Sequence, residues 1–114
     1  MSPPGSRHST AVLLVQQALR QALQPQFHVR GEQPVALDDM SQPEPDVSVV
    51  DGDIRDYTHG HPGQTLLLVE VSDSTLTHDR GVKLAAYARN DVPEYWLLDL
   101  QSSRLEVYRK PSGS

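Results

Sequence analysis

The chain has 114 residues, of which 37% are hydrophobic and 22% charged, the composition of an ordinary globular protein with room for one domain. The absence of cysteine excludes disulfide frameworks and thiolate metal sites. A formal net charge of −5 argues against a protein that grips nucleic acid by charge alone, because such proteins normally show a basic surface.

The two ends of the chain are polar. We expect a single domain over residues 1–114, with flexible ends at about 1–8 and 110–114. The first eight residues lack the apolar core of a signal peptide, and the longest apolar run, Leu66 to Val69, is far too short to span a bilayer. The sequence therefore predicts a soluble, cytoplasmic protein with no membrane contact.

The first predicted element is a helix that Ser9 or Thr10 can cap and that runs to about Leu23, before Pro25. Its apolar residues recur at helical spacing, and they are Val12, Val15, Leu19, Ala22 and Leu23. This spacing leaves Gln16, Arg20 and Gln24 facing outward.

One or two short strands are predicted next, over residues 27–30 and 35–37, with a break near Gly31 and Pro34. A polar turn from Asp38 to Pro45 leads to a β-branched strand over residues 46–50. Residues 54–64 show no periodicity, which indicates a surface loop.

Residues 65–71 are apolar on both alternating faces, which predicts the central strand of a sheet covered on two sides. After a turn at 72–75, Asp79 can cap a second helix from about Arg80 to Arg89. Residues 94–99 and 104–109 read as a hairpin of two strands. The order α-β-β-β-α-β-β predicts an α/β fold with helices flanking a mixed central sheet.

Two carboxylates stand at the ends of predicted strands. Asp46 begins one strand, and Glu70 ends an otherwise apolar one. Proteins bury a carboxylate chiefly where it is paired or holds a metal ion. If the strands are neighbours, both acids can converge on Mg²⁺ or Mn²⁺, because magnesium prefers oxygen ligands and needs only one or two carboxylates. Alternatively, Asp46 is a turn residue, and Glu70 pairs with Arg80 or Lys83.

Lys83 falls in the first turns of the second helix, where a positive charge opposes the helix dipole. It could point over the sheet at a phosphate oxygen or an attacking water. Tyr87, four residues later, lies on the same side of the helix and could line the site. The alternative is that Lys83 is a solvated surface charge.

Other chemistry-bearing residues favour structural readings. The histidines at 59, 61 and 78 fall in predicted loops and lack the spacing of a helical zinc site. Tyr95 and Trp96 could stack on a base, but an aromatic pair in a strand is more often core packing.

Four segments carry the candidate residues and their flanks: Pro43–Val47, Leu68–Thr75, Asp79–Tyr87 and Val92–Asp99. In this order and spacing they resemble the bacterial Uma-two-type restriction endonucleases, a branch of the PD-(D/E)XK nuclease superfamily. Four ordered motifs are more specific than a lone Pro-Asp pair, and the resemblance runs from about His8 to Tyr108.

The resemblance implies a restriction-endonuclease-like core and a metal-dependent endonuclease that hydrolyses DNA. It makes Asp46 the aspartate of the Pro-Asp motif and Glu70 the acid of the (D/E)-x-K motif. Ser72 stands where the superfamily has its lysine, and in this branch Lys83 takes that place from the helix. Glu32 resembles an acid that recurs before the Pro-Asp strand and could complete a second ligand shell.

Competing functions stay open at this point. The first is an endonuclease with catalytic Asp46, Glu70 and Lys83, working alone or with a separate DNA-reading partner protein. The second is a non-catalytic module that keeps the fold for dimerisation or partner binding, and the final hairpin could pair edge to edge in a homodimer. A basic, concave surface around Glu70 would favour the first reading, and an acidic or blocked one the second.

Overall fold

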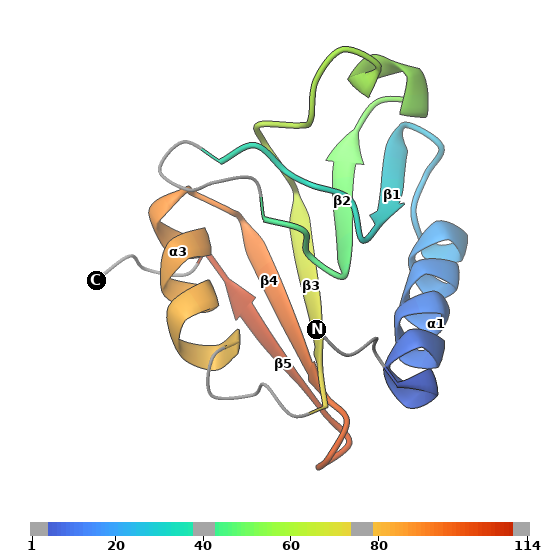
Figure 1. The fold of residues 1–114 in the computed structure, drawn as a ribbon. Helices are drawn as coiled ribbons and strands as arrows, with labels where there is room; N and C mark the ends of the chain where they lie inside the picture. The colour runs from blue at the N-terminus through green and yellow to red at the C-terminus, as the bar shows by residue number, and fades with distance from the viewer. Residues whose placement is uncertain (1–4, 38–42, 74–78, 111–114) are drawn as a thin grey trace.

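The structure is a computed structural model that describes residues 5–37, 43–73 and 79–110. Its centre is a mixed sheet in the order β1-β2-β3-β4-β5, in which β3 and β4 are parallel and the other neighbours antiparallel (Figure 1). The elements are α1 (Ser6–Ala22), β1 (Phe27–Gly31), β2 (Val47–Asp51), η1 (Ile54–Tyr57), β3 (Leu67–Ser72), η2 (Asp79–Lys83), α3 (Leu84–Arg89), β4 (Glu94–Asp99) and β5 (Arg104–Arg109). The predicted α/β class and element order are confirmed.

The sheet separates two apolar clusters because side chains alternate along each strand. On one face, Val69 and Val71 of β3 pack with Val12 and Leu19 of α1. On the other face, Leu68 of β3 packs beneath α3; the cluster there comprises Val35, Leu37, Leu68, Tyr87, Val92, Tyr95 and Leu97. β3 is the middle strand and is buried along its whole length, as predicted.

The first helix differs from its prediction at its start and on its polar side. It begins at Ser6 with Gly5 as N-cap, so it starts earlier than the capping residues at 9 and 10 suggested. Gln16 was expected to face outward, but it is buried. A Cβ on Gly31 would lie 2.1 Å from Gln16 Nε2, so the missing side chain of Gly31 makes room for this amide.

The strand predicted over residues 35–37 is absent from the described sheet. Val35 and Leu37 are buried, but the backbone N–H of Val35 donates to Pro43 O and that of Ala36 to Pro62 O. These bonds tie the segment to neighbouring loops instead of to a strand. The strand prediction is therefore wrong at 35–37, and the two apolar residues belong to the core instead.

The remaining loops follow the expected order. The predicted loop at 54–64 contains the short helix η1, and the second helix begins with the π-helical turn η2 before α3. Parts of the predicted turns (38–42, 74 and 75), His78, and residues 1–4 and 111–114 of the ends lie outside the described residues. Of the helices that the structure describes, none is long and apolar enough to cross a membrane.

Candidate functional site

The pairing of β2 with β3 brings the two candidate carboxylates together. These strands are antiparallel with Ser48 opposite Leu68, and continuing that register sets Asp46 opposite Glu70. The backbone N–H of Asp46 lies 3.4 Å from Glu70 Oε1, and the N–H of Val71 donates to Asp46 Oδ2 at 2.7 Å. Asp46 is thus fixed to the backbone of β3 beside Glu70, at the carboxyl end of that strand.

Glu70 is a carboxylate inside the apolar layer beneath α3. The residue is 2% exposed, and its Oε2 accepts a hydrogen bond from the Tyr87 hydroxyl at 2.9 Å. Burial raises the pKa of Glu70 to about 7, although the Lys83 charge and the Tyr87 hydroxyl pull it back. Burial likewise raises the pKa of Tyr87, so its hydroxyl stays protonated and donates.

Lys83 joins two buried acids. Its Nζ lies 3.3 Å from Glu70 Oε2 and 3.1 Å from Asp79 Oδ1, and its side chain keeps 33% of its surface exposed. Burial lowers the pKa of Lys83, but the charges of Glu70 and Asp79 outweigh it, so the pKa is raised and the ammonium stays charged. Of the alternatives, the ion pair of Glu70 with Lys83 is the one that forms, and Arg80 points elsewhere.

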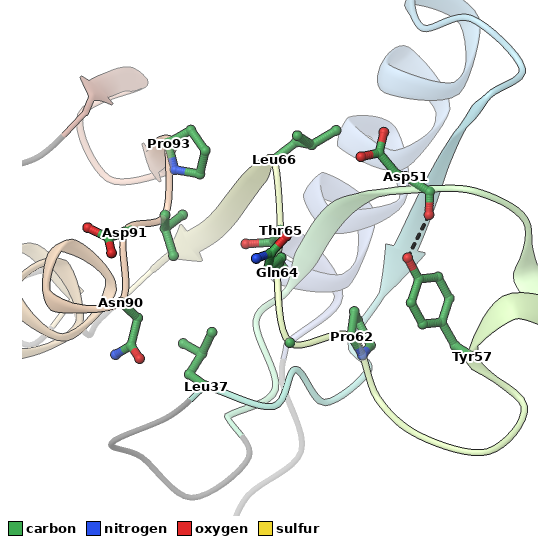
Figure 2. Close-up of a pocket in the computed structure, with 12 residues that line it drawn as sticks. Leu37, Asp51, Tyr57, Pro62, Gln64, Thr65, Leu66, Asn90, Asp91 and Pro93 are labelled. Carbon is green, nitrogen blue, oxygen red and sulfur yellow. Dashed lines mark hydrogen bonds between the residues drawn. The ribbon is translucent and has the colours of Figure 1, made fainter.

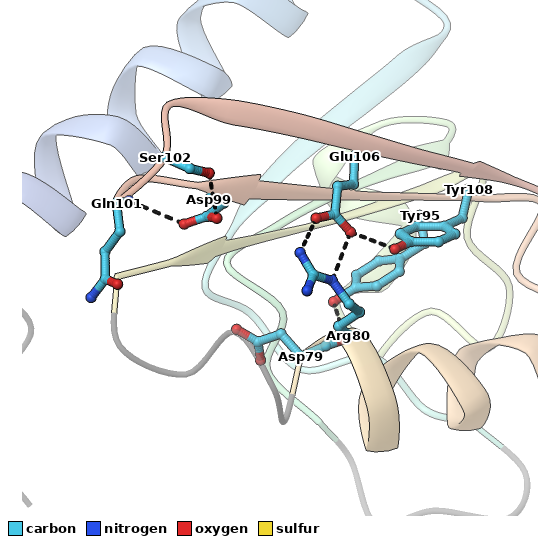
Figure 3. Close-up of polar contacts among 8 residues, drawn as sticks. All are labelled: Asp79, Arg80, Tyr95, Asp99, Gln101, Ser102, Glu106 and Tyr108. Carbon is cyan, nitrogen blue, oxygen red and sulfur yellow. Dashed lines mark hydrogen bonds and ion pairs between the residues drawn. The ribbon is translucent and has the colours of Figure 1, made fainter.

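A polar network outside the site holds η2 against the sheet (Figure 3). Arg80 makes two hydrogen bonds to the carboxylate of Glu106 on β5, and Tyr108 donates to the same carboxylate. The Tyr95 hydroxyl of β4 donates to the backbone oxygen of Asp79 at 3.0 Å. These contacts fix the turn from which Lys83 reaches Glu70.

The structure also brings in His8, which the sequence reading did not single out. His8 Nε2 lies 3.4 Å from Asp46 Oδ2, and the histidine side chain is 18% exposed. The contact exists because α1 starts at Ser6, which carries residue 8 on the helix instead of in a flexible end. The second unpredicted member is the Asp79 side chain, which was read only as a helix cap.

Two supporting candidates lie at the margins. Ser72 is buried on the Glu70 face of β3, and its hydroxyl finds no hydrogen-bond partner within the part of the chain described. Glu32 is exposed, has a positive φ of 51°, and donates its backbone N–H to Asp46 O at 3.0 Å. Its backbone, not its carboxylate, touches the site.

The donor set at Asp46 and Glu70 suits a hard divalent ion. Across residues 5–37, 43–73 and 79–110, no group of three or more His, Cys, Asp or Glu side chains is placed to hold a metal. Magnesium needs no such cage, because it keeps several waters and is held by one or two carboxylates plus substrate phosphate. The Asp46 side chain beside the buried Glu70 is partly exposed. The residues therefore fit Mg²⁺ or Mn²⁺.

A cavity of about 570 Å³ lies at the opposite end of the sheet, where β3 and β4 begin (Figure 2). Thr65 and Leu66 line it before β3, and Asn90, Asp91 and Pro93 line it before β4. None of the predicted site residues is among the described residues lining it. This cavity and the ionic cluster are thus separate features.

Comparison with known proteins is consistent with this geometry. The model of the Uma2 family, described as "Putative restriction endonuclease", matches residues 1–114. No match was found among curated proteins. The fold is similar to a crystal structure of "a putative nuclease belonging to DUF820" from Anabaena variabilis ATCC 29413, with a TM-score of 0.71 and 16% identity over 96% of this chain. The chain spans 65% of that longer protein.

Proposed function

The chain belongs to the Uma2 family of restriction-endonuclease-like nucleases, and from this premise we propose that it is a metal-dependent endonuclease that hydrolyses phosphodiester bonds of DNA. The observation that carries the proposal is the buried Glu70 carboxylate, held between Lys83, Tyr87 and the backbone of Asp46. A carboxylate that is 2% exposed within an apolar layer destabilises a fold unless it is paired or holds a metal ion.

Each residue has a part in this proposal. Asp46 and Glu70 would hold Mg²⁺ or Mn²⁺, which when bound supplies Lewis-acid activation of phosphate and a water of lowered pKa. Lys83, charged and partly exposed, would stabilise the negative charge that develops on the phosphate oxygens. Tyr87 orients the Glu70 carboxylate through its hydrogen bond. His8 contacts Asp46 Oδ2, the same oxygen that accepts from the backbone of Val71.

The test is calorimetric titration of Mg²⁺ and Mn²⁺ into the wild type and into Asp46→Asn and Glu70→Gln, followed by incubation of the same samples with supercoiled plasmid. Asp91→Asn is the matched control, because it removes one negative charge from an exposed residue at the opposite end of the sheet. Its positive φ of 57° suits asparagine as well as aspartate.

The proposal expects binding in the wild type and the control, loss of binding in both site variants, and metal-dependent nicking only where metal binds. Absence of binding at millimolar metal together with absence of nicking would overturn it. The carboxylates would then be structural, and a non-catalytic module for dimerisation or partner binding would be the better account.

A further inference from the structure

A basic groove runs along the outer edge of the sheet, apart from the candidate metal site. It has a volume of about 540 Å³ and follows β1. This edge strand of the sheet lies between β2 and α1 (Figure 1). Arg20 comes from α1, His28 and Arg30 come from β1, and Tyr57 and His61 come from the segment after β2. In a chain of net charge −5, the described lining of this groove has two arginines against one carboxylate, Glu32.

Arg30 is the centre of this groove. The residue is only 7% exposed, its Nη2 donates to Pro34 O at 3.2 Å, and its guanidinium carbon lies 5.3 Å from the centre of the Tyr57 ring. Its buried Nε finds no hydrogen-bond partner among the residues that the structure describes. A guanidinium offers five N–H donors, and a buried one left partly unpaired is costly unless a ligand completes it.

The second arginine lies across the edge strand from the first. Arg20 is exposed and donates from Nη2 to Val29 O at 3.3 Å, a contact that sets its guanidinium against the outer edge of β1. Burial lowers the pKa of His28, and the charges of Arg30 and Arg20 lower it further, which indicates a positive potential between them. Glu32 is the acid among the described lining residues, and Asp53 acts on His28 from nearby.

We propose that this groove binds the phosphates of a nucleic-acid strand, with Arg30 and Arg20 as the phosphate ligands. Arginine presents a fork of donors that matches phosphate oxygens, and the Tyr57 ring packs against the Arg30 guanidinium. Glu32, which lines the groove, donates its backbone N–H to the backbone oxygen of Asp46, so one lining residue is bonded to the main chain of a catalytic candidate. The choice of nucleic acid as ligand rests on the proposed nuclease function.

The experiment measures binding of a short fluorescein-labelled DNA duplex by anisotropy in EDTA, over a series of salt concentrations, so that neither metal nor cleavage enters. Arg20→Gln and Arg30→Gln each remove one cation, and Arg104→Gln on β5 removes one at the opposite edge of the sheet. Glu32→Gln removes the acid of the groove. Circular dichroism checks that each variant is folded, since Arg30 is buried.

The groove variants are expected to weaken binding several-fold and to reduce the slope of log K against log salt by about one each. Arg104→Gln should match the wild type, and Glu32→Gln should bind more tightly. If Arg30→Gln fails to fold, Arg20→Gln and Glu32→Gln still decide the matter, because both positions are exposed.

If Arg20→Gln and Glu32→Gln bind the duplex as tightly as the wild type does, the proposal for the groove is overturned. The proposed nuclease function is not, because the metal titration tests it separately. Loss of affinity in the groove variants without any plasmid nicking would keep the groove and reject the nuclease. If inorganic phosphate alone binds as tightly as the duplex, the groove is a site for the free anion. Polyglutamate that competes equally with the duplex would show a site for acidic peptides, and either result overturns the proposal.

Discussion

The two faces of the central sheet are built from the same strands and differ in kind. Under α1, the core cluster includes Val47, Val49, Val69 and Val71, and the buried polar residue of the helix, Gln16, is uncharged. Under α3, the layer that contains Leu68 and Tyr87 also buries a carboxylate, Glu70. Apolar packing accounts for the α1 face, whereas the α3 face buries a charged group that folding alone would not select. A buried charge on one face only is therefore a mark of function more than of stability.

The largest expected effect comes from transferring a carboxylate to the apolar face. Val69→Asp places an unpaired charge at a site with 0% exposure, next to the position where Glu70 is tolerated. We expect a loss of more than about 4 kcal/mol in the free energy of unfolding, sufficient to abolish cooperative folding in a small domain. Urea denaturation followed by circular dichroism measures it.

Val107→Asp is the matched control for that variant, because Val107 is 42% exposed on β5. It should change the free energy of unfolding by less than about 1 kcal/mol. A Val69→Asp protein that unfolds with the wild-type midpoint would show that the two faces do not differ in the way proposed.

The reverse change tests the polar face. Glu70→Gln removes the buried charge but keeps the shape, and Lys83 remains paired with Asp79 and partly exposed, so we expect the fold to be retained with stability within about 2 kcal/mol of wild type. Plasmid nicking should fall at least about a hundredfold, since a metal ligand supplies several kcal/mol of transition-state stabilisation. A variant that nicks normally would remove Glu70 from the mechanism, and one that unfolds would make its role structural.

Part of this difference between faces follows from the sequence, because alternation in strands 46–50 and 65–71 sets which residues share a face with Asp46 and with Glu70, and the register of β2 with β3 then puts the two acids on one side. Helical spacing likewise places Lys83 and Tyr87 on one side of their helix, and both contact Glu70 Oε2. His8 could not be found in this way. Its contact spans 38 positions of sequence from residue 8 to Asp46 and depends on where α1 begins.

Other errors share that cause. The polar side chain of Gln16 predicts an exposed position, but the side chain is buried because Gly31, which has no side chain, leaves room for its amide. The strand predicted at Val35 fails because its backbone finds partners in loops that no local pattern reveals. The basic groove was missed for the same reason, since its arginines come from α1 and β1, and only tertiary packing brings them together.

The pH dependence of metal binding sharpens the comparison further. Since the pKa of Glu70 is raised to about 7, protons compete with the ion for this carboxylate. Affinity for Mn²⁺ should be level above pH 7 and fall about tenfold for each pH unit below it. Titration calorimetry between pH 5.5 and 8 measures this, and an affinity that stays level down to pH 5.5 would contradict the raised pKa.

Without metal, the same shift acts on stability with the opposite sign. The folded protein holds the Glu70 proton more tightly than the unfolded chain does, for which the ordinary pKa is 4.5. The contribution of the protonated Glu70 to the free energy of unfolding is therefore greatest below pH 4.5, and it declines as the pH rises to about 7. Glu70→Gln should lose this decline, so the difference between the two stability profiles isolates it.

The smallest effect is expected where only the orientation of Glu70 changes. Tyr87→Phe removes the hydroxyl that donates to Glu70 Oε2 at 2.9 Å, which should cost about 1 kcal/mol of stability. That hydrogen bond lowers the pKa of Glu70, so its loss should raise this pKa. Metal affinity should then begin to fall at a higher pH than in the wild type. Tyr57→Phe, which loses a hydroxyl bond to Asp51 O far from Glu70, should leave that pH unchanged. If both variants give the same profile, Tyr87 is a packing residue, and the polarity of this face resides in Glu70 and Lys83 alone.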